Sequence, residues 1–189
     1  MTFATLQARP RKLGELLDGF ADVGELADLL VDNVESDSRR VTEGSLYMAC
    51  RSFTSARHGL NYTDQALSQG ASAIAYEPVP DLNLPEASVP LIPVPGLSHA
   101  AGEIAARLYD NPSRQLYLIG ITGTDGKTSC AHILAQAIEY LGGRCGLLGT
   151  LGFGFLDDLK APTHTTPDAV NLQRWIAYLR NEGADAVAM

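Results

Sequence analysis

The alternation of apolar and polar residues is clearest in the second half of the chain. Residues 115–122, QLYLIGIT, form a short apolar run that is typical of a buried strand. After a glycine-containing loop, apolar side chains recur three and four residues apart, at Cys130, Ile133, Leu134, Ala137, Ile138 and Leu141. This spacing predicts an amphipathic helix that packs one apolar stripe on the core and ends at the Gly142-Gly143 pair. The predicted order is strand, glycine loop, helix.

The pattern continues to the end of the chain. Residues 146–155 are rich in glycine and apolar side chains, which predicts a strand and a turn. A second helix follows, with Pro167 suited to its first turn, Gly183 at its end, and a buried face at Leu172, Trp175, Ile176 and Leu179. Residues 184–189, ADAVAM, begin a further strand. Because the chain stops inside an apparent core strand, we expect the sequence to be a piece of a longer protein.

The first half also alternates between strands and helices. Leucine clusters between residues 13 and 30 are interrupted by glycines, which predicts short helices or turns. Strands are expected at 45–50, 71–77 and 89–94, with helices at 63–69 and 97–109. This alternation predicts the α/β class. Residues 110–113, DNPS, form a natural break because proline cannot continue a helix, so we predict one domain over 1–112 and a second over 113–189.

Composition narrows the choice of partners. The chain has 22 acidic and 14 basic residues, a formal net charge of −8, so a basic nucleic-acid-binding face is not expected. No apolar run is long enough to cross a bilayer, and the first residues lack the apolar core of a signal peptide. We therefore expect a cytoplasmic protein with no membrane insertion. The three cysteines contain no CxxC pair and lie in apolar surroundings, which predicts reduced, buried thiols. The oligomeric state is left open.

The candidate chemistry lies in the loop GITGTDGKTS, residues 120–129. A glycine loop between a strand and a helix aims backbone N–H groups at one point, where the helix N-terminus adds partial positive charge. Lys127 is expected to reach the outer phosphates as the catalytic cation, and the Thr128 hydroxyl to bind Mg²⁺. The common pattern needs glycine at 121, where isoleucine stands. The sequence therefore predicts a shorter phosphate loop made of Gly123, Thr124, Asp125, Gly126, Lys127, Thr128 and Ser129. The alternative is a turn with a solvated lysine.

Asp125 is the unusual member of this loop. A carboxylate beside a triphosphate is repelled unless it points away or meets the metal ion. It is equally suited to capping the N-terminus of the following helix. Both interpretations stay open at this point.

The loop TGTDGKTS, preceded by LIGI, resembles the ATP loop of the Mur ligases, whose usual form is TGTNGKT. Residues 36–50, SDSRRVTEGSLYMAC, resemble the DSR…G.LF.A signature shared by the MurE and MurF branches of that family. Residues 58–77 resemble the region that follows this signature, and residues 163–189, which begin THTTPD, resemble MurE in particular. These segments occur in the family's order and cover nearly the whole chain, which favours the MurE branch.

The resemblance implies a small N-terminal domain that binds the UDP-N-acetylmuramoyl group, followed by the first part of a P-loop-type parallel-sheet ATPase domain. It implies ATP and Mg²⁺ as cofactors. The implied reaction adds meso-diaminopimelate or L-lysine to UDP-N-acetylmuramoyl-L-alanyl-D-glutamate through an acyl phosphate. Family members are much longer and carry a further metal ligand and an amino-acid-binding domain, so the chain alone is expected to be inactive. A MurF or folate-polyglutamate ligase, and a non-catalytic UDP-sugar-binding module, are the alternatives.

The resemblance also implies substrate-binding residues. Ser36, Ser38 and Arg39 are implied at the nucleotide sugar, and the segment Ser55, Ala56, Arg57 and His58 at the uridine diphosphate. An ordinary surface loop is the alternative for that segment. Thr165 and Thr166, with His164 beside them, are implied at the muramyl peptide, although Thr165-Thr166-Pro167 alone indicates only a helix start. DNPS at 110–113 is similar to the family's D-N-P-R motif for diaminopimelate, but it lacks the arginine and lies in the wrong domain, so we interpret it as a linker.

Overall fold

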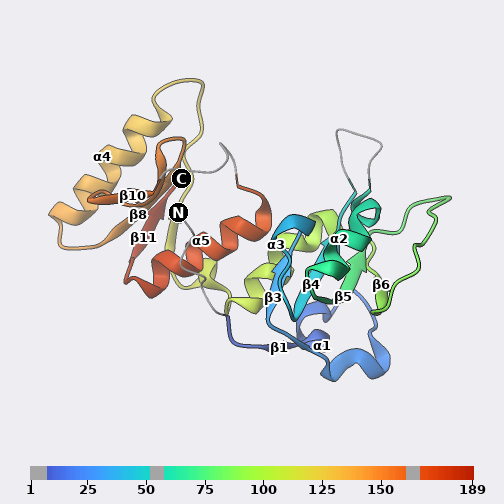
Figure 1. Cartoon of the computed structure of the whole chain (residues 1–189). Helices are drawn as coiled ribbons and strands as arrows, with labels where there is room; N and C mark the ends of the chain where they lie inside the picture. The colour runs from blue at the N-terminus through green and yellow to red at the C-terminus, as the bar shows by residue number, and fades with distance from the viewer. Residues whose placement is uncertain (1–7, 52–57, 161–166) are drawn as a thin grey trace. The chain divides into compact units, whose positions relative to one another are not determined.

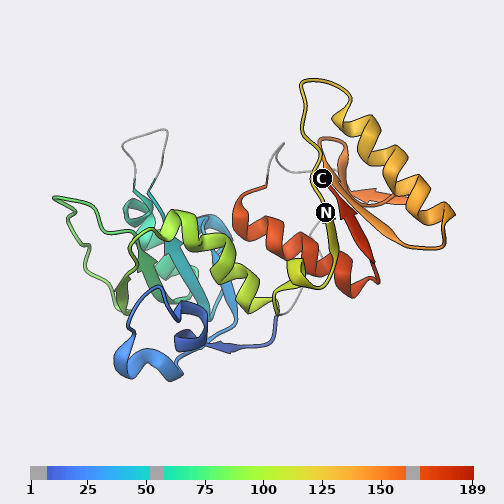
Figure 2. The same cartoon turned by 180° about the vertical axis from the view of Figure 1, so that it is seen from behind.

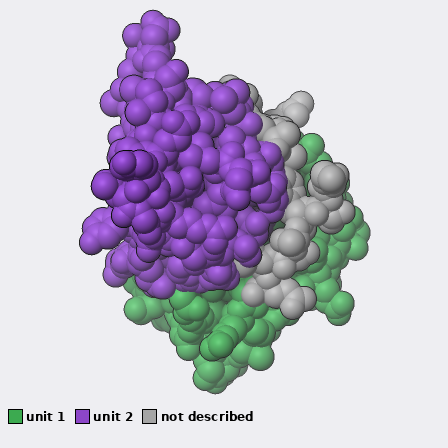
Figure 3. Space-filling model, turned by 90° about the vertical axis from the view of Figure 1, so that its left-hand side faces the viewer, with its two compact units in different colours: residues 1–110 green, residues 111–189 purple. Residues whose placement is uncertain are grey.

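The computed structural model describes residues 8–51, 58–160 and 167–189. It divides into two compact units, residues 1–110 and residues 111–189, which are coloured separately in Figure 3. Each unit contains parallel strands with helices packed on them, so the predicted α/β class is confirmed. At the division, Asp110 and Asn111 adopt left-handed backbone angles (φ 61° and 49°), and Pro112 opens a 3-10 turn, η4 (Pro112–Arg114). The predicted domain boundary lay between residues 112 and 113.

Unit 1 is built on a four-stranded parallel sheet whose strand order follows the sequence. Helix α2 (Thr63–Ser68) lies on one face, while α1 (Leu13–Leu17) and α3 (Leu97–Leu108) lie on the other (Figures 1 and 2). The sheet strands are β3 (Asn33–Glu35), β4 (Ser45–Ala49), β5 (Ala71–Tyr76) and β6 (Leu91–Pro93). Outside this sheet lie the β1–β2 pair (Arg11–Lys12, Leu30–Val31) and the 3-10 segments η1 (Gly24–Asp28), η2 (Ser38–Arg40) and η3 (Gly59–Tyr62).

Coverage of both faces explains the apolar composition of the central strands. All five residues of β4 are buried. Alternation along the strand sends Tyr47 and Ala49 into a cluster with Leu60, Ala66 and Ile74, and sends Leu46 and Met48 to the opposite face. A parallel strand that is buried on both faces has apolar residues in succession rather than in alternation, and LYMA after Ser45 has this pattern.

Unit 2 contains a five-stranded sheet of order β10-β9-β8-β11-β7. Strands β7 (Tyr117–Ile119), β8 (Cys145–Gly149) and β11 (Ala186–Ala188) are parallel, and β9 (Gly152–Phe155) and β10 (Asp158–Lys160) extend the sheet as antiparallel strands. Because β11 lies between β7 and β8 and all three strands are parallel, their carboxyl ends lie at the same edge of the sheet. Ligands of open α/β sheets bind at such edges.

Two helices cover this sheet, and strand alternation sorts the side chains between them. Cys145 and Leu147 of β8 pack with α4 (Lys127–Tyr140). Leu148 of β8 and Val187 of β11 belong to the cluster that includes α5 (Ala169–Asn181). In that cluster the ring of Trp175 stacks on Phe153, with centroids 4.6 Å apart and planes 4° from parallel. The predicted buried face of α5 is confirmed: Trp175, Ile176 and Leu179 are buried and Leu172 packs against them.

One prediction about burial in unit 2 is wrong, and a second is confirmed only in part. Strand β7 is exposed rather than buried, with Tyr117 80% and Leu118 37% exposed, because within the described residues β11 is its pairing strand and β7 forms the edge. Helix α4 packs through Ala131 and Ala135, and of the predicted stripe only Leu134 and Ile138 pack against that cluster, where they are partly buried. Cys130, Ile133 (65%) and Leu141 (83%) are exposed.

The three cysteines differ in burial, and Cys130 is exposed with the outer face of α4. Cys145 is buried as predicted, but Cys50 is only partly buried and Cys130 is exposed. Within the described residues, no helix is long and apolar enough to cross a membrane.

Candidate phosphate-binding site

The loop between β7 and α4 is shaped by its glycines. Gly126 is the N-cap of α4 with a left-handed φ of 76°, and no side chain caps this helix. Gly123 has φ 156°, and a Cβ placed on it would lie 3.5 Å from the carbonyl oxygen of Asp125, so the loop curls closely on itself. The capping interpretation of Asp125 is therefore wrong, because Gly126 occupies the N-cap position. The first turn of α4 directs backbone N–H groups toward the space beside the loop.

Lys127 is the first residue of α4, and its side chain folds back over the loop. Its ammonium donates hydrogen bonds to the carbonyl oxygens of Gly123 and Thr124, the second at 3.3 Å. The side chain is exposed to solvent. A neutral carbonyl is a weaker acceptor for an ammonium than a phosphate oxygen, so an arriving phosphate would find this cation at the loop and able to exchange its partners.

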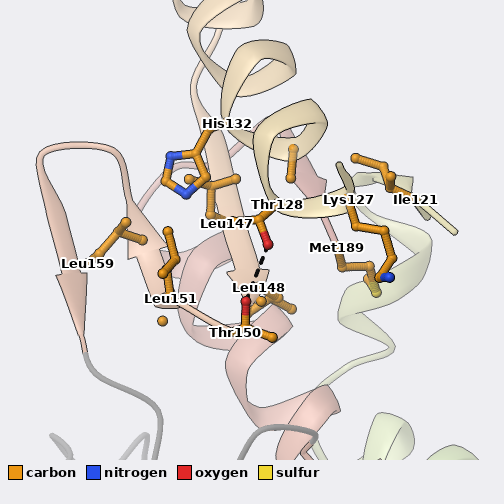
Figure 4. A pocket seen from close by; sticks show the side chains of 13 residues that line it. Ile121, Lys127, Thr128, His132, Leu147, Leu148, Thr150, Leu151, Leu159 and Met189 are labelled. Carbon is orange, nitrogen blue, oxygen red and sulfur yellow. Dashed lines mark hydrogen bonds between the residues drawn. The ribbon is translucent and has the colours of Figure 1, made fainter. Parts of the chain in front are cut away.

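Thr128 faces a pocket of about 140 Å³ at the carboxyl edge of the sheet. Its hydroxyl lies 3.3 Å from the hydroxyl of Thr150, which follows β8. Figure 4 shows these two hydroxyls facing each other, with Lys127 and His132 on opposite sides of Thr128. The rest of the lining is mostly aliphatic: Ile121, Ala131, Leu147, Leu148, Leu151, Leu159 and Met189, with Gly149 and Gly152.

The donors at this edge suit a cation that arrives with phosphates. Within the described residues, no group of three His, Cys, Asp or Glu side chains could hold a metal ion. The hydroxyls of Thr128 and Thr150 are the side-chain oxygen donors that line the pocket together with Lys127. Mg²⁺ keeps several waters and takes few protein oxygens beside substrate phosphates, so these residues fit a nucleotide-bound Mg²⁺ better than a metal held by protein alone.

The predicted nucleotide-sugar residues of unit 1 follow the carboxyl end of β3. Ser38 is 5% exposed and its hydroxyl donates to Gln65 Oε1 at 2.7 Å. Arg39 is exposed and donates to both carboxylate oxygens of Asp37, at 2.9 and 2.6 Å. This hydrogen bond from Arg39 lowers the pKa of Asp37. Ser36 is half-buried just before them, so the three predicted residues lie together at one edge of the parallel sheet.

His58 is held by the backbone. It is 8% exposed, and its Nδ1 accepts a hydrogen bond from the Leu60 N–H at 3.1 Å, capping η3. Its Nε2 therefore carries the hydrogen and donates to the carbonyl oxygen of Glu77 at 2.8 Å. Both ring nitrogens are engaged, so the ring links the start of η3 to the residue that follows β5. The other predicted residues Ser55, Ala56, Arg57, His164, Thr165 and Thr166 lie outside the described residues.

Sequence reasoning missed several polar residues at these edges. Tyr47 is 1% exposed and donates to the carbonyl oxygen of Gly59 at 2.9 Å, and burial raises its pKa. Glu77 accepts from the backbone N–H of Ser98 at 3.1 Å at the start of α3. Thr150 was part of a segment described only as strand and turn. Their positions in the sequence were the signal that could have identified Glu77 and Thr150, because each residue directly follows a parallel strand.

The comparisons with known proteins agree with this architecture. Residues 30–109 match the Mur ligase family, catalytic domain, and residues 121–189 match the Mur ligase middle domain. The chain is 44% identical over 177 residues to the UDP-N-acetylmuramoyl-L-alanyl-D-glutamate–2,6-diaminopimelate ligase of Coxiella burnetii, covering 94% of this chain and 36% of that protein. It is 45% identical over 187 residues to the ligase of the same name from Alkalilimnicola ehrlichii, covering 94% and 37%.

Solved structures give the same result for the fold. A structure of a UDP-N-acetylmuramoyl-L-alanyl-D-glutamate–2,6-diaminopimelate ligase superposes with a TM-score of 0.77 at 25% identity, covering 95% of this chain and 35% of that one. The MurF protein of Acinetobacter baumannii shares the fold, with a TM-score of 0.61 at 16% identity, covering 96% and 36%. The chain spans about a third of the length of these relatives. The two domain matches and the sequence relatives together show that the chain belongs to the Mur ligase family.

Proposed function

We propose that this chain is part of an ATP-dependent, MurE-type ligase of peptidoglycan precursor synthesis, and hence of cell-wall formation, acting in the cytoplasm. Its substrates would be UDP-N-acetylmuramoyl-L-alanyl-D-glutamate and an amino acid. Diaminopimelate is favoured over L-lysine because the relatives at 44–45% identity are named as diaminopimelate ligases. The observation that carries the proposal is the glycine loop at the carboxyl edge of unit 2, where Lys127 and the first turn of α4 converge on one pocket.

The reaction requires charge neutralisation and alignment. The substrate carboxylate attacks the γ-phosphorus of ATP, the bond to ADP breaks, and an acyl phosphate forms. The amine then attacks the acyl carbon, phosphate leaves, and the nitrogen loses a proton. Lys127 and the N–H groups of α4 bind the phosphates, and the Thr128 hydroxyl is available to the accompanying Mg²⁺. Mg²⁺ bound with the nucleotide would neutralise charge on the transferred group.

Unit 1 is proposed to bind the UDP part of the precursor. Arg39 is exposed beside Ser38, and its guanidinium can exchange the Asp37 carboxylate for a diphosphate oxygen. We retain Ser36 and the segment Ser55 to His58 at the nucleotide, and His164, Thr165 and Thr166 at the peptide, on the sequence resemblance alone. A MurF-type activity is the second candidate, but its structural likeness at 16% identity concerns the fold only.

Nucleotide binding is the direct test. Calorimetric titration of the 189-residue chain with ATP and Mg²⁺ should show saturable binding, and Lys127→Ala should weaken it about 10-fold to 100-fold, since hydrogen bonds to charged groups contribute roughly 1.5–3 kcal/mol. Lys12→Ala is the matched control, because Lys12 is an exposed lysine that pairs with Asp28 in unit 1. Equal affinity of Lys127→Ala and the unsubstituted chain would contradict the assignment.

A further inference from the structure

The connection between β8 and β9 is a short, fixed hairpin. Gly149 pairs with Gly152 across the two strands, which leaves Thr150 and Leu151 as a two-residue connection. Strand β10 closes against this hairpin: a Cβ on Gly152 would lie 2.4 Å from the carbonyl oxygen of Lys160. Because the ladder holds both arms of so short a loop, the position of Thr150 is set by the sheet.

The hairpin tip meets the first turn of α4. The hydroxyl oxygens of Thr150 and Thr128 lie 3.3 Å apart, although the residues are far apart in sequence. Both residues line the pocket, with Thr128 half-buried and Thr150 exposed (Figure 4). The contact therefore joins the end of a parallel strand to the start of the helix that follows the phosphate loop.

The chemistry of a hydroxyl gives this contact a direction. A threonine hydroxyl has one proton and two lone pairs, so a hydroxyl that binds a cation through a lone pair must direct its proton to another acceptor. In a helix that acceptor is often the carbonyl four residues earlier, which for Thr128 is Thr124. The Thr124 carbonyl also accepts from the Lys127 ammonium at 3.3 Å, so the ammonium competes with the Thr128 hydroxyl for that oxygen. The Thr150 oxygen is the acceptor that the sheet places opposite the Thr128 hydroxyl.

We propose that Thr150 is a positioning residue that accepts the Thr128 proton and thereby aims a Thr128 lone pair at the divalent cation that accompanies a bound nucleotide. This inference rests on the proposed nucleotide site and adds a residue to it. Thr150 does not touch the cation in this scheme. Its own proton is left for solvent or for a phosphate oxygen.

The test separates cation-dependent from cation-independent nucleotide affinity. ADP is titrated calorimetrically into the full chain, once with Mg²⁺ and once with EDTA, and the ratio of the two affinities is the readout. Thr150→Val removes the hydroxyl and keeps the side-chain volume, so it should reduce that ratio about threefold to tenfold, the effect of one hydrogen bond. Affinity in EDTA should not change. Thr150→Ser keeps the hydroxyl and should keep the ratio.

Two results would overturn the inference. The first is an unchanged Mg²⁺ ratio in Thr150→Val; this includes an equal loss of affinity with and without Mg²⁺, which would indicate a change of loop shape. The second is an equal reduction of the ratio in Thr150→Ser. Thr150→Ala is a second hydroxyl-free variant at an exposed site that needs no core packing, and Trp175 fluorescence reports whether unit 2 is folded. Absence of ADP binding by the unsubstituted chain would reject the proposed function itself, whereas binding that ignores Thr150→Val rejects only this inference.

Discussion

Gly146, the second residue of β8, provides a sharp test of how α5 packs on the sheet. A Cβ on this residue would lie 2.7 Å from Cδ1 and 2.9 Å from Cδ2 of Leu179. Carbon atoms pack at about 3.5–4.0 Å, so an added methyl overlaps the leucine by roughly 1 Å. Gly146 does not have a positive φ, so alanine is acceptable to the backbone and the expected effect of Gly146→Ala is steric.

The magnitude follows from the surroundings of Leu179. This side chain is fully buried among Trp175, Ile176 and Val187, so it cannot move into solvent. Overpacking a core by a methyl group costs about 1–3 kcal/mol, and replacing a strand glycine returns roughly 0.5–1 kcal/mol. We expect Gly146→Ala to lower the free energy of unfolding of unit 2 by up to about 2.5 kcal/mol.

The double variant with Leu179→Ala tests the cause. Leu179→Ala alone should cost about 2–5 kcal/mol because it leaves a cavity. Combined with Gly146→Ala, the clash disappears and the added methyl occupies part of the cavity. The double variant should therefore be more stable than the sum of the single effects predicts, by about 1–3 kcal/mol.

Urea unfolding followed by tryptophan fluorescence measures these differences in unit 2 alone. The chain has one tryptophan, Trp175, which is 9% exposed and stacked on Phe153 in that unit. Gly149→Ala is the matched control, since a Cβ at Gly149 would meet nothing within 4 Å. An unfolding midpoint for Gly146→Ala equal to that of Gly149→Ala, or strict additivity in the double variant, would refute the packing argument.

Two predictions concern unit 1. Arg39→Ala removes a charged donor and should lower the affinity for UDP, measured by calorimetry, about tenfold or more. Lys12→Ala is the control and should leave the UDP affinity unchanged. An unaltered UDP affinity in Arg39→Ala would remove Arg39 from the proposed site. Burial raises the folded-state pKa of Tyr47, so its contribution to stability is present below the unfolded pKa of about 10 and is lost as pH rises above it. Tyr47→Phe should therefore flatten the alkaline loss of stability that far-UV circular dichroism measures. If the unsubstituted chain and Tyr47→Phe lose stability with the same slope at alkaline pH, Tyr47 is excluded as the cause.

The two helices of unit 2 show what periodicity predicts well. In α5 the apolar stripe at Leu172, Trp175, Ile176 and Leu179 stands opposite polar residues, so one face qualifies as the buried one, and that face is buried. In α4 two stripes overlap. The large residues Ile133 and Leu141 favour one, while Ala131 and Ala135 form another with the same spacing. The sheet beneath α4 carries Ala186 and Ala188, and small residues on both sides allow the helix to approach closely. Hydrophobicity along α4 alone cannot show that its packing partner is a sheet surface of small residues.

The candidate site also has features that could be predicted from the sequence and features that could not. The strand, glycine loop and helix start are local in sequence, so the glycine loop and the place of Lys127 at the start of α4 could be predicted. The role of Asp125 could not, because either Asp125 or Gly126 suits an N-cap and backbone geometry decides between them. Thr150 could not be assigned either, because its contact with Thr128 depends on the β8–β9 register and on how α4 packs on β8.

The hydrogen bonds that each predicted site residue already makes determine how much free energy is needed to turn its side chain to a ligand. Lys127 rests on neutral carbonyl groups in solvent, and exchanging them for phosphate oxygens gains charge complementarity. Arg39 must leave the Asp37 carboxylate, but its side chain is 71% exposed and solvent screens such a surface pair, so this exchange costs little free energy. His58 differs, because turning its ring to a ligand breaks two hydrogen bonds to buried backbone groups and removes the cap of η3. Binding energy at both carboxyl edges should therefore come from the exposed cations, while the buried histidine links the start of η3 to the residue that follows β5.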